Sequence, residues 1–404
     1  MPRTPPQPLE VVRALVPPAE VRVAGRLVGT EAGRLLLAGN GAHLWVRAEL
    51  RAEPGAWVLA GGTWDGVEVR GWAEVLATPH APFPRPAGEW ARLQEDGGRR
   101  AALLRSRAEV RRAVRAFFDL RGFLEVETPV MVPSPGLDVH LDAFEVAPGP
   151  PPRWLSTSPE YQMKRLLAGG LSRIYQIGKC FRRGEQGSRH EPEFTMVEWY
   201  RAFAGSPEVM ADTEELVAHV AGALNGGSQR VRFAGHSIDV APPWERLTVD
   251  EAFQRHAGES MWSVLPDEER FFRLLVDRVE PRLGVVKPTF LVGWPASMAS
   301  LARLCPENPR LADRFEGYAG GMELCNGFGE LVDPVEQRAR LERDQARRRQ
   351  LGKPVHPIDE RFVQALEEGL PPCGGNALGL DRLVMLVLGV ENVADVLAVP
   401  HRRL

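Results

Sequence analysis

Two apolar stretches joined by a charged loop limit the fold of this chain more than any other feature. Residues 172–181 (SRIYQIGKCF) and 193–203 (EFTMVEWYRAF) have the composition of strands, and the loop between them is rich in arginine and glutamate. In the second stretch Glu198 shares a face with Phe194 and Tyr200, because strand side chains alternate. A carboxylate in an apolar row is costly to bury unless a positive group meets it. The sequence therefore predicts a hairpin that carries a charged site.

The rest of the chain predicts two folded parts. Short stretches separated by glycine over residues 20–78 suggest about five strands, which suit a small closed barrel of the OB type. Beyond it the pattern shows few strand–helix–strand alternations, which favours an antiparallel sheet flanked by helices. We expect an OB-like barrel over residues 1–80, a Pro/Gly-rich linker over 81–100 and a larger α+β domain over 101–404.

Composition and charge exclude several classes of protein. The chain is 44% hydrophobic and 25% charged, as in soluble globular proteins, and its net charge of −3 gives no general attraction to nucleic acid or anionic membranes. We expect a cytoplasmic protein without a membrane partner, because there is no signal-peptide pattern and no apolar run approaches about 18 residues. The four cysteines are scattered, and none has the spacing of a zinc site.

The arginine-rich loop suggests a phosphate site. Arg182 comes at the end of the first strand, where its planar guanidinium can hold a phosphate through two hydrogen bonds. Glu185 and His190 could then order a nucleotide. The alternative is a surface hairpin with interleaved ion pairs, which add little stability.

Two C-terminal stretches suggest partners for such a nucleotide. In GMELCNGFGEL, Glu323 and Glu330 are seven residues apart with Asn326 between them, which suits Mg²⁺ carrying nucleotide phosphates. A solvated acidic strand is the alternative. In NALGLDRLVML, Arg382 begins an apolar helix and needs an anion, either a triphosphate or a structural partner, which would be Asp381 or a glutamate.

A third stretch, TSPEYQMKRLL, suggests a helix start near the site. Pro159 can occupy the first helical turn, with Ser158 as a possible cap. Glu160 would then point from the helix start toward the space above the sheet. The alternative is a carboxylate placed there only because it interacts favourably with the helix dipole.

These stretches, in this order, resemble the class II aminoacyl-tRNA synthetases, and in particular their lysyl branch. FLEVETPVM is similar to the first, dimer-forming motif of that class, FRRGEQGSRHEPEFTMVEWY to the second, and NALGLDRLVMLVLGVENVADVLAVP to the third. The resemblance extends over about residues 105–404. Within the branch the chain more closely resembles the elongation factor P–lysine ligases, and Ala377 stands where tRNA-charging lysyl enzymes usually have glycine.

The resemblance implies a role for each residue of the site. ATP would be bound by Arg182, Glu185, His190, Glu191, Glu323, Leu324, Gly379 and Arg382. The amino acid would be bound by Ser158, Pro159, Glu160, Glu198, Tyr200, Asn326 and Glu330. Glu323 and Glu330 would hold Mg²⁺, and Arg182, Arg382 and Glu323 would serve catalysis by alignment and charge neutralisation.

The implied reaction is the ATP-dependent activation of lysine, with the β isomer expected, followed by transfer to a lysine side chain of elongation factor P. The two ammonium groups of either isomer explain why the site carries buried acids. A compact lysyl-tRNA synthetase is the first alternative, with tRNA as a possible partner, and a catalytically silent binding module is the second. The first motif also implies a homodimer.

The chain departs from the family pattern in two places. Glu191 stands where most relatives have the asparagine of HNPEF, so a negative charge near ATP could repel phosphate, or could face an amino group or Arg183. The OB-like module is an addition to the ligase pattern, and its ligand is open. Its four tryptophans could stack on bases, although tryptophans in so small a barrel are more often core residues; they are Trp45, Trp57, Trp64 and Trp72.

Overall fold

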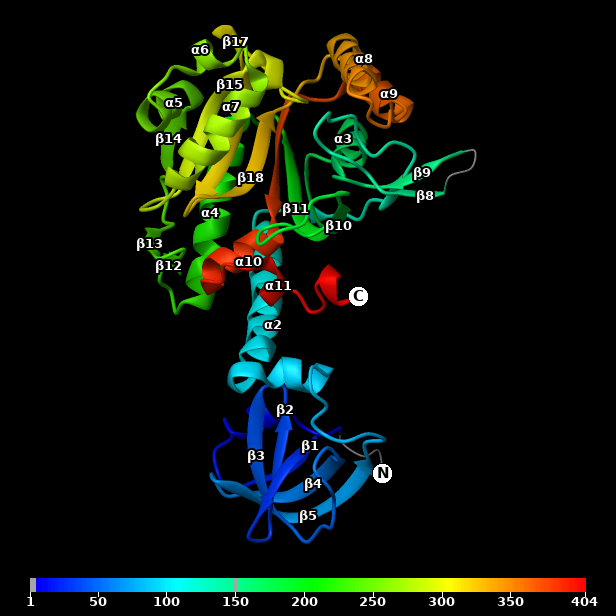
Figure 1. Cartoon of the computed structure of the whole chain (residues 1–404), viewed down its shortest axis with the longest axis vertical. Helices are drawn as coiled ribbons and strands as arrows, with labels where there is room; N and C mark the ends of the chain where they lie inside the picture. Colours follow the sequence, from blue (N-terminus) through cyan, green and yellow to red (C-terminus); the bar gives the residue numbers. More distant parts are fainter. Residues whose placement is uncertain (1–4, 148–150) are drawn as a thin grey trace. The chain divides into compact units, whose positions relative to one another are not determined.

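The computed structural model describes residues 5–147 and 151–404 (Figure 1). The chain divides into two compact units, Met1–Ser106 and Arg107–Leu404. No helix among the described residues is long and apolar enough to cross a membrane.

The first unit contains a closed five-stranded barrel with the strand order β1-β2-β3-β5-β4. Its strands are β1 (Ala19–Glu31), β2 (Arg34–Gly39), β3 (Ala42–Arg47), β4 (Trp57–Trp64) and β5 (Glu68–Ala77), preceded by the short helix α1 (Leu9–Val12). Side chains such as Val23, Leu37 and Val58 alternate into a fully buried core, which explains the period-two pattern of the sequence. The expected small OB-like barrel is therefore present.

The tryptophans of the barrel have different environments. Trp64 is buried in the barrel core, as expected. Trp57 and Trp72 instead lie on the surface, 42% and 47% exposed, so the expectation of core residues is wrong for these two.

The range predicted as a linker, 81–100, contains the start of a long helix. Residues 81–88 form neither helix nor strand, whereas α2 runs from Glu89 to Asp119. Gly97 and Gly98 have φ values of +68° and +87°, a conformation that favours glycine, so the backbone is irregular at this point of the helix. Beyond it the apolar side chains Val110, Val114, Phe117 and Phe118 are buried.

The second unit is built on a nine-stranded sheet with the order β14-β15-β17-β18-β19-β11-β10-β6, in which β16 pairs with β17. Only the outer pairs β14–β15 and β6–β10 are parallel. The expected α+β fold with a mainly antiparallel sheet is therefore confirmed. The strands are β6 (Leu124–Glu125), β10 (Arg173–Phe181), β11 (Glu193–Ala202), β14 (Glu245–Thr248), β15 (Thr289–Pro295), β16 (Leu304–Cys305), β17 (Asn308–Ala319), β18 (Met322–Gly329) and β19 (Cys373–Gly379).

Helices and small sheets surround this sheet. Helix α4 packs against β17, β18 and β19, and the rings of Tyr161 and Phe362 stack 4.5 Å apart between α3 and α9. The α-helices are α3 (Glu160–Ala168), α4 (Ser206–Leu224), α5 (Val249–Ala257), α6 (Met261–Val264), α7 (Glu268–Leu274), α8 (Pro334–Gln350), α9 (Glu360–Gly369), α10 (Leu380–Leu388) and α11 (Val393–Val396). The small sheets contain β7 (Met131–Val132), β8 (Glu145–Ala147), β9 (Arg153–Leu155), β12 (Arg230–Phe233) and β13 (His236–Asp239).

The predicted hairpin lies toward one edge of the sheet, where β10 is followed by the edge strand β6. Strands β10 and β11 are antiparallel, with Gln176 opposite Glu198, and β19 pairs with the other side of β11, where Ala377 is opposite Glu198. Strand β18 follows β19. Three stretches that are far apart in the sequence therefore meet on adjacent strands.

Candidate active site

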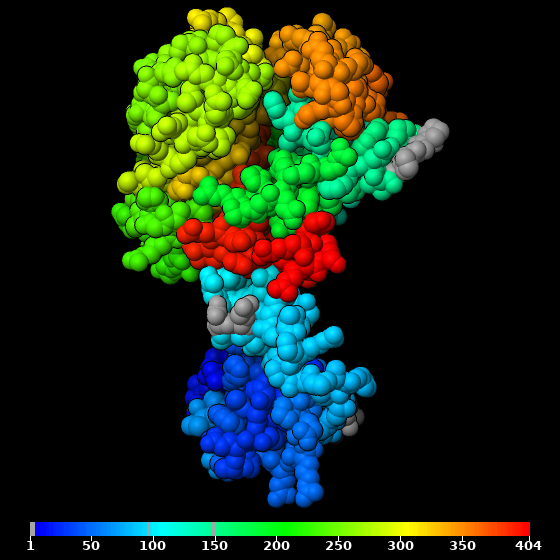
Figure 2. Space-filling view, viewed as in Figure 1, coloured from blue at the N-terminus to red at the C-terminus, as the bar shows by residue number. Residues whose placement is uncertain are grey.

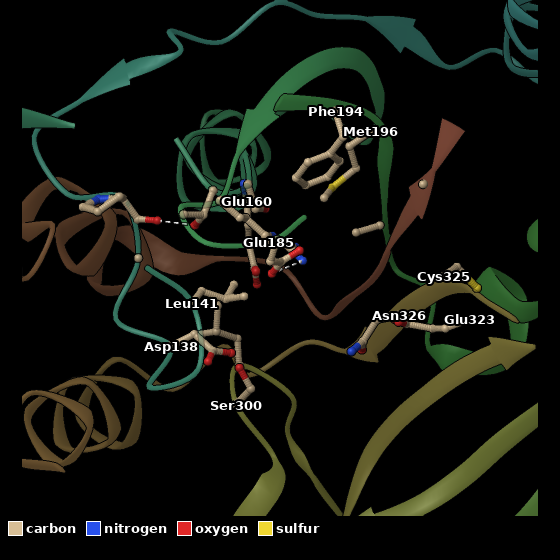
Figure 3. A pocket seen from close by; sticks show the side chains of 18 of the residues that line it. Asp138, Leu141, Glu160, Glu185, Phe194, Met196, Ser300, Glu323, Cys325 and Asn326 are labelled. Atoms are coloured by element: carbon tan, nitrogen blue, oxygen red, sulfur yellow. Dashed lines mark hydrogen bonds and ion pairs between the residues drawn. The ribbon is translucent and has the colours of Figure 1, made fainter. Parts of the chain in front are cut away.

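A cavity of about 290 Å³ opens in the second unit (Figure 3). Its walls come from the loop 134–141, the start of α3, the loop 182–192, strands β11, β18 and β19, and helices α8 and α10. The residues predicted from the sequence that line it are Ser158, Glu160, Arg182, Glu185, His190, Glu191, Glu323, Leu324, Asn326, Gly379 and Arg382. Pro159, Glu198, Tyr200 and Glu330 do not line the cavity and form its second layer.

One end of the cavity carries guanidinium groups. The Nη1 atom of Arg382 donates to the carbonyl and the Oε2 atom of Glu323, at 2.9 and 3.0 Å. Its Nη2 atom lies 2.7 Å from Nε2 of His190. Burial, and then the charge of Arg382, lowers the pKa of His190, so the neutral imidazole can accept this hydrogen bond.

Arg182 lies at the same end with spare hydrogen-bonding capacity. Its Nη1 atom is 3.7 Å from Oε1 of Glu185, and its guanidinium stacks over the ring of Phe194 at 5.0 Å. Within the described part of the chain, its buried Nε atom has no hydrogen-bond partner. A buried donor without a partner is costly, and an anion in the cavity would satisfy it.

Asp381 is a structural residue and does not partner Arg382. Its carboxylate pairs with Arg107 at 2.5 Å and accepts the backbone N–H of Thr195 at 2.7 Å. Arg382 instead pairs with Glu323, which is the glutamate partner considered as an alternative from the sequence. This pair lines the cavity and remains partly exposed.

The other end of the cavity holds a buried group of acids around an internal lysine. The ammonium of Lys164 lies 2.6 Å from Oε1 of Glu160 and 2.6 Å from Oε2 of Glu330, and the lysine side chain is fully buried. Burial alone would lower the pKa of Lys164, but the two carboxylates more than offset this effect and raise it. Lys164 therefore stays charged and holds Glu160 at the cavity wall.

Glu198 lies behind Ser158 and, among the residues that the structure describes, has no cationic partner within hydrogen-bonding distance. Its carboxylate accepts hydrogen bonds from the hydroxyls of Ser158 and Tyr200, at 2.9 and 2.7 Å. Burial, and then the nearby charge of Glu160, raises the pKa of Glu198 to about 7. A cation bound in the cavity would favour the ionised form.

The start of α3 differs slightly from the expectation. Pro159 occupies the N-cap position and not the first helical turn, and it provides no side-chain cap. The hydroxyl of Ser158 accepts the backbone N–H of Glu160 at 3.1 Å, so the capping role passes to the residue before the proline.

Glu323 and Glu330 do not form a shared metal site in the structure. Glu323 pairs with Arg382, whereas Glu330 pairs with Lys164 and does not line the cavity. Among the described residues no three side chains of the types that bind metals converge on one point. Mg²⁺ usually binds one or two carboxylates together with substrate phosphates, and of the two predicted ligands Glu323 is the one that lines the cavity.

Several residues of the site were not predicted from the sequence. Lys164 follows Glu160 by four residues, the spacing of neighbours on a helix, and this signal could have identified the pair. Glu316 is buried on β17 and accepts hydrogen bonds from Arg314 and Asn326, at 2.6 and 3.2 Å. The Oδ1 atom of Asn326 is buried and has no hydrogen-bond partner among residues 5–147 and 151–404, which leaves an acceptor for a ligand.

Comparison with known proteins assigns the chain to a family. A family described as tRNA synthetases class II (D, K and N) matches residues 93–403. The elongation factor P–(R)-β-lysine ligase of Proteus mirabilis is 45% identical over 316 residues, covering 75% of this chain and 96% of that protein. The ligases of the same name from Hamiltonella defensa and Photorhabdus laumondii are each 43% identical, over 74% of this chain and 95% and 94% of those proteins.

These relatives confirm the resemblance seen in the sequence. They match about three quarters of the chain and nearly their own whole length. The chain therefore belongs to the class II tRNA synthetases of the D, K and N type and, within them, to the family of the elongation factor P–β-lysine ligases.

Proposed function

We propose that this protein uses ATP to activate lysine, preferentially the β isomer, and transfers it to a lysine side chain of elongation factor P. The observation that carries the proposal is that one cavity has guanidinium groups at one end and buried acids at the other. The guanidinium groups suit a nucleoside triphosphate, and the acids suit an amino acid with two positive charges. The name of the relatives, elongation factor P–(R)-β-lysine ligase, supports the choice of isomer and acceptor.

The first step is the formation of an adenylate. A carboxylate oxygen of the amino acid attacks the α-phosphorus of ATP, and pyrophosphate leaves. Arg182 and Arg382 would stabilise the negative charge on the phosphates, because their guanidinium groups already line the cavity. Mg²⁺, bound by Glu323 and the phosphates, would add further charge neutralisation.

The amino-acid end would orient the substrate for this attack. One ammonium group would lie against Glu160 and the unpartnered Oδ1 atom of Asn326. Glu198, behind Ser158, would add negative charge without direct contact. These side chains are held in place by the fold before the substrate binds. The carboxylate of the bound amino acid can therefore be oriented for attack with little further loss of conformational entropy in the protein.

The second step forms an amide. The neutral amine of the acceptor lysine attacks the carbonyl carbon of the adenylate, AMP leaves with the bonding electrons of the C–O bond, and the amine loses a proton. No side chain of the protein needs to form a covalent bond in either step.

An acceptor assay tests the proposal. Purified elongation factor P and total tRNA are offered in parallel, with ATP and labelled lysine or (R)-β-lysine. We expect the label on elongation factor P, with β-lysine preferred, and pyrophosphate exchange that depends on the amino acid. Label on tRNA alone would contradict the proposal.

Aminoacylation of tRNA is the second candidate, because of the barrel. Trp57 and Trp72 are exposed on it, and the guanidinium of Arg26 lies 5.5 Å from the centre of the Trp57 ring, an arrangement that can stack on bases. The same assay decides between the two acceptors.

We also propose a cytoplasmic homodimer. In the stretch that resembles the dimer-forming motif, Leu124 and Met131 are 52% and 51% exposed, and an apolar surface of this kind is typical of an interface. Light scattering after gel filtration should give twice the mass of the chain, and a monomer would contradict this part of the proposal.

A further inference from the structure

Glu191 stands where the sequence pattern that the chain resembles has asparagine. Its side chain lines the cavity at the end that carries Arg182 and Arg382, yet the residue is only 5% exposed. A buried carboxylate beside a triphosphate site would weaken nucleotide binding unless something held its charge elsewhere.

The structure shows what holds this carboxylate. The Oε2 atom of Glu191 accepts the backbone N–H of His401 at 3.0 Å. His401 is the first residue of a 3₁₀ turn, His401–Arg403, whose first N–H groups have no partner within the turn.

A second hydrogen bond fastens the same C-terminal segment to the same loop. The backbone N–H of Val393 donates to the carbonyl of Ser188 at 2.8 Å, and Val393 also lines the cavity. Figure 2 shows the red C-terminal segment against the green loop that joins β10 and β11. The segment 393–403 thus holds the nucleotide loop at two points, 188 and 191.

Several cations lie near Glu191, so the direction in which its carboxylate points affects the charge of the cavity. Arg182, Arg189 and Arg382 line the same end of the cavity. Arg189 donates to the carbonyl of Gly321 at 2.6 Å, and Arg382 is paired with Glu323, so neither is bonded to Glu191. A carboxylate released from His401 would therefore be free to pair with these cations and to repel phosphate.

We propose that Glu191 is a positioning residue that binds the C-terminal turn and does not contact the nucleotide. The N–H of His401 keeps the carboxylate away from the phosphate subsite, and in return the carboxylate holds segment 393–403 against the loop. This inference rests on the proposed function in one respect, namely that ATP occupies the end of the cavity with Arg182 and Arg382.

The substitution His401→Pro removes the donor and little else. Proline has no N–H, its fixed φ suits the first position of a helical turn, and it requires an extended residue before it. Pro400 has φ −71° and ψ 153°, which meets this requirement. His401→Ala is the matched control, since it removes the imidazole and keeps the N–H.

We expect His401→Pro to raise the KM for ATP about tenfold in amino-acid-dependent pyrophosphate exchange, with kcat within about threefold of wild type. His401→Ala should behave as the wild type. In the background Glu191→Asn, His401→Pro should raise the KM no further, because no carboxylate remains to be released. An equal rise in both backgrounds would overturn the proposal, as would an unchanged KM in His401→Pro.

A measurement without turnover keeps the inference separate from the proposed function. Amide hydrogen exchange of the peptide containing residues 393–404 should be faster in Glu191→Asn than in the wild type, and faster in His401→Pro than in His401→Ala. Unchanged amide hydrogen exchange in both comparisons would contradict the proposal that Glu191 holds the C-terminal segment. If no amino acid supports pyrophosphate exchange, the proposed function fails, whereas the exchange rates still decide whether Glu191 binds the turn.

Discussion

The two ends of the cavity hold their charges in different ways. At the end where we propose that the nucleotide binds (the nucleotide end), the side chains of Arg382 and Glu323 are 19% and 37% exposed and paired with each other. At the end where we propose that the amino acid binds (the amino-acid end), Lys164 and Glu330 are 0% and 1% exposed. Partly exposed pairs are screened by water and can exchange partners when a ligand arrives, whereas buried pairs are fixed by the fold. The comparison suggests that the nucleotide end rearranges on binding and that the amino-acid end is preorganised.

The largest effect on activity should come from a substitution at the nucleotide end. Arg382→Ala should lower kcat/KM for lysine-dependent pyrophosphate exchange by about 10²–10³-fold, because a group that stabilises developing phosphate charge is lost. The free energy of unfolding should change little, since the partner Glu323 remains in contact with water. Pyrophosphate exchange and urea denaturation measure the two quantities, and Arg361→Ala on the surface of α9 is the control. Exchange at the wild-type rate would show that Arg382 does not bind phosphate.

Lys164→Met should mainly affect stability, in contrast to Arg382→Ala. It leaves the buried carboxylate of Glu330 and the partly buried one of Glu160 without their cation, which should lower the free energy of unfolding by about 3–5 kcal/mol. The double variant Lys164→Met/Glu330→Gln removes one charge of each sign and should recover most of the loss. Urea denaturation of both variants checks this prediction, and a stable single variant would mean that the acids are not held by Lys164.

Glu198→Gln should affect the binding of the amino acid and leave the binding of ATP unchanged. We expect the KM for the amino acid to rise about tenfold and the KM for ATP to stay the same, because one negative charge is lost behind the amino-acid subsite. Steady-state pyrophosphate exchange with each substrate varied gives both constants. A rise in the KM for ATP of similar size would show that the two ends are not independent.

The pH dependence of amino-acid binding should be the smallest effect. Since burial raises the pKa of Glu198 from 4.5 to about 7, the ionised form that attracts an ammonium group accumulates only as the pH rises through that value. The KM for the amino acid should therefore fall severalfold between about pH 6 and about pH 8. The profile should flatten in Glu198→Gln, and an unchanged slope would assign the titration to another group.

Local pattern predicted most of the fold. Strand alternation placed Glu198 and Tyr200 on one face, and the glycine-separated strands predicted the barrel. The start of α2 was missed, because the Pro-rich sequence before Glu89 and the Gly97–Gly98 pair suggested a linker. The structure instead continues the helix past those glycines.

Long-range contacts explain what the sequence could not reveal about the site. Glu330 was predicted to bind Mg²⁺ from its spacing to Glu323, but the fold brings it to Lys164 on α3 and buries it beside that lysine. Glu191 contacts His401, 210 residues further along the chain. The periodicity of side chains along a single helix or strand does not reveal such pairs, since they depend on which elements become neighbours in the fold.

A crystal structure with a non-hydrolysable lysyl-adenylate analogue tests the central claim most directly. We expect the phosphate of the analogue to lie within hydrogen-bonding distance of Arg182 or Arg382. An ammonium group should lie within about 4 Å of Glu160, which is the limit of an ion pair, and Lys164 should still be bound to Glu330. An analogue bound outside this cavity, or one whose ammonium groups point to solvent while its phosphate avoids both arginines, would contradict the claim.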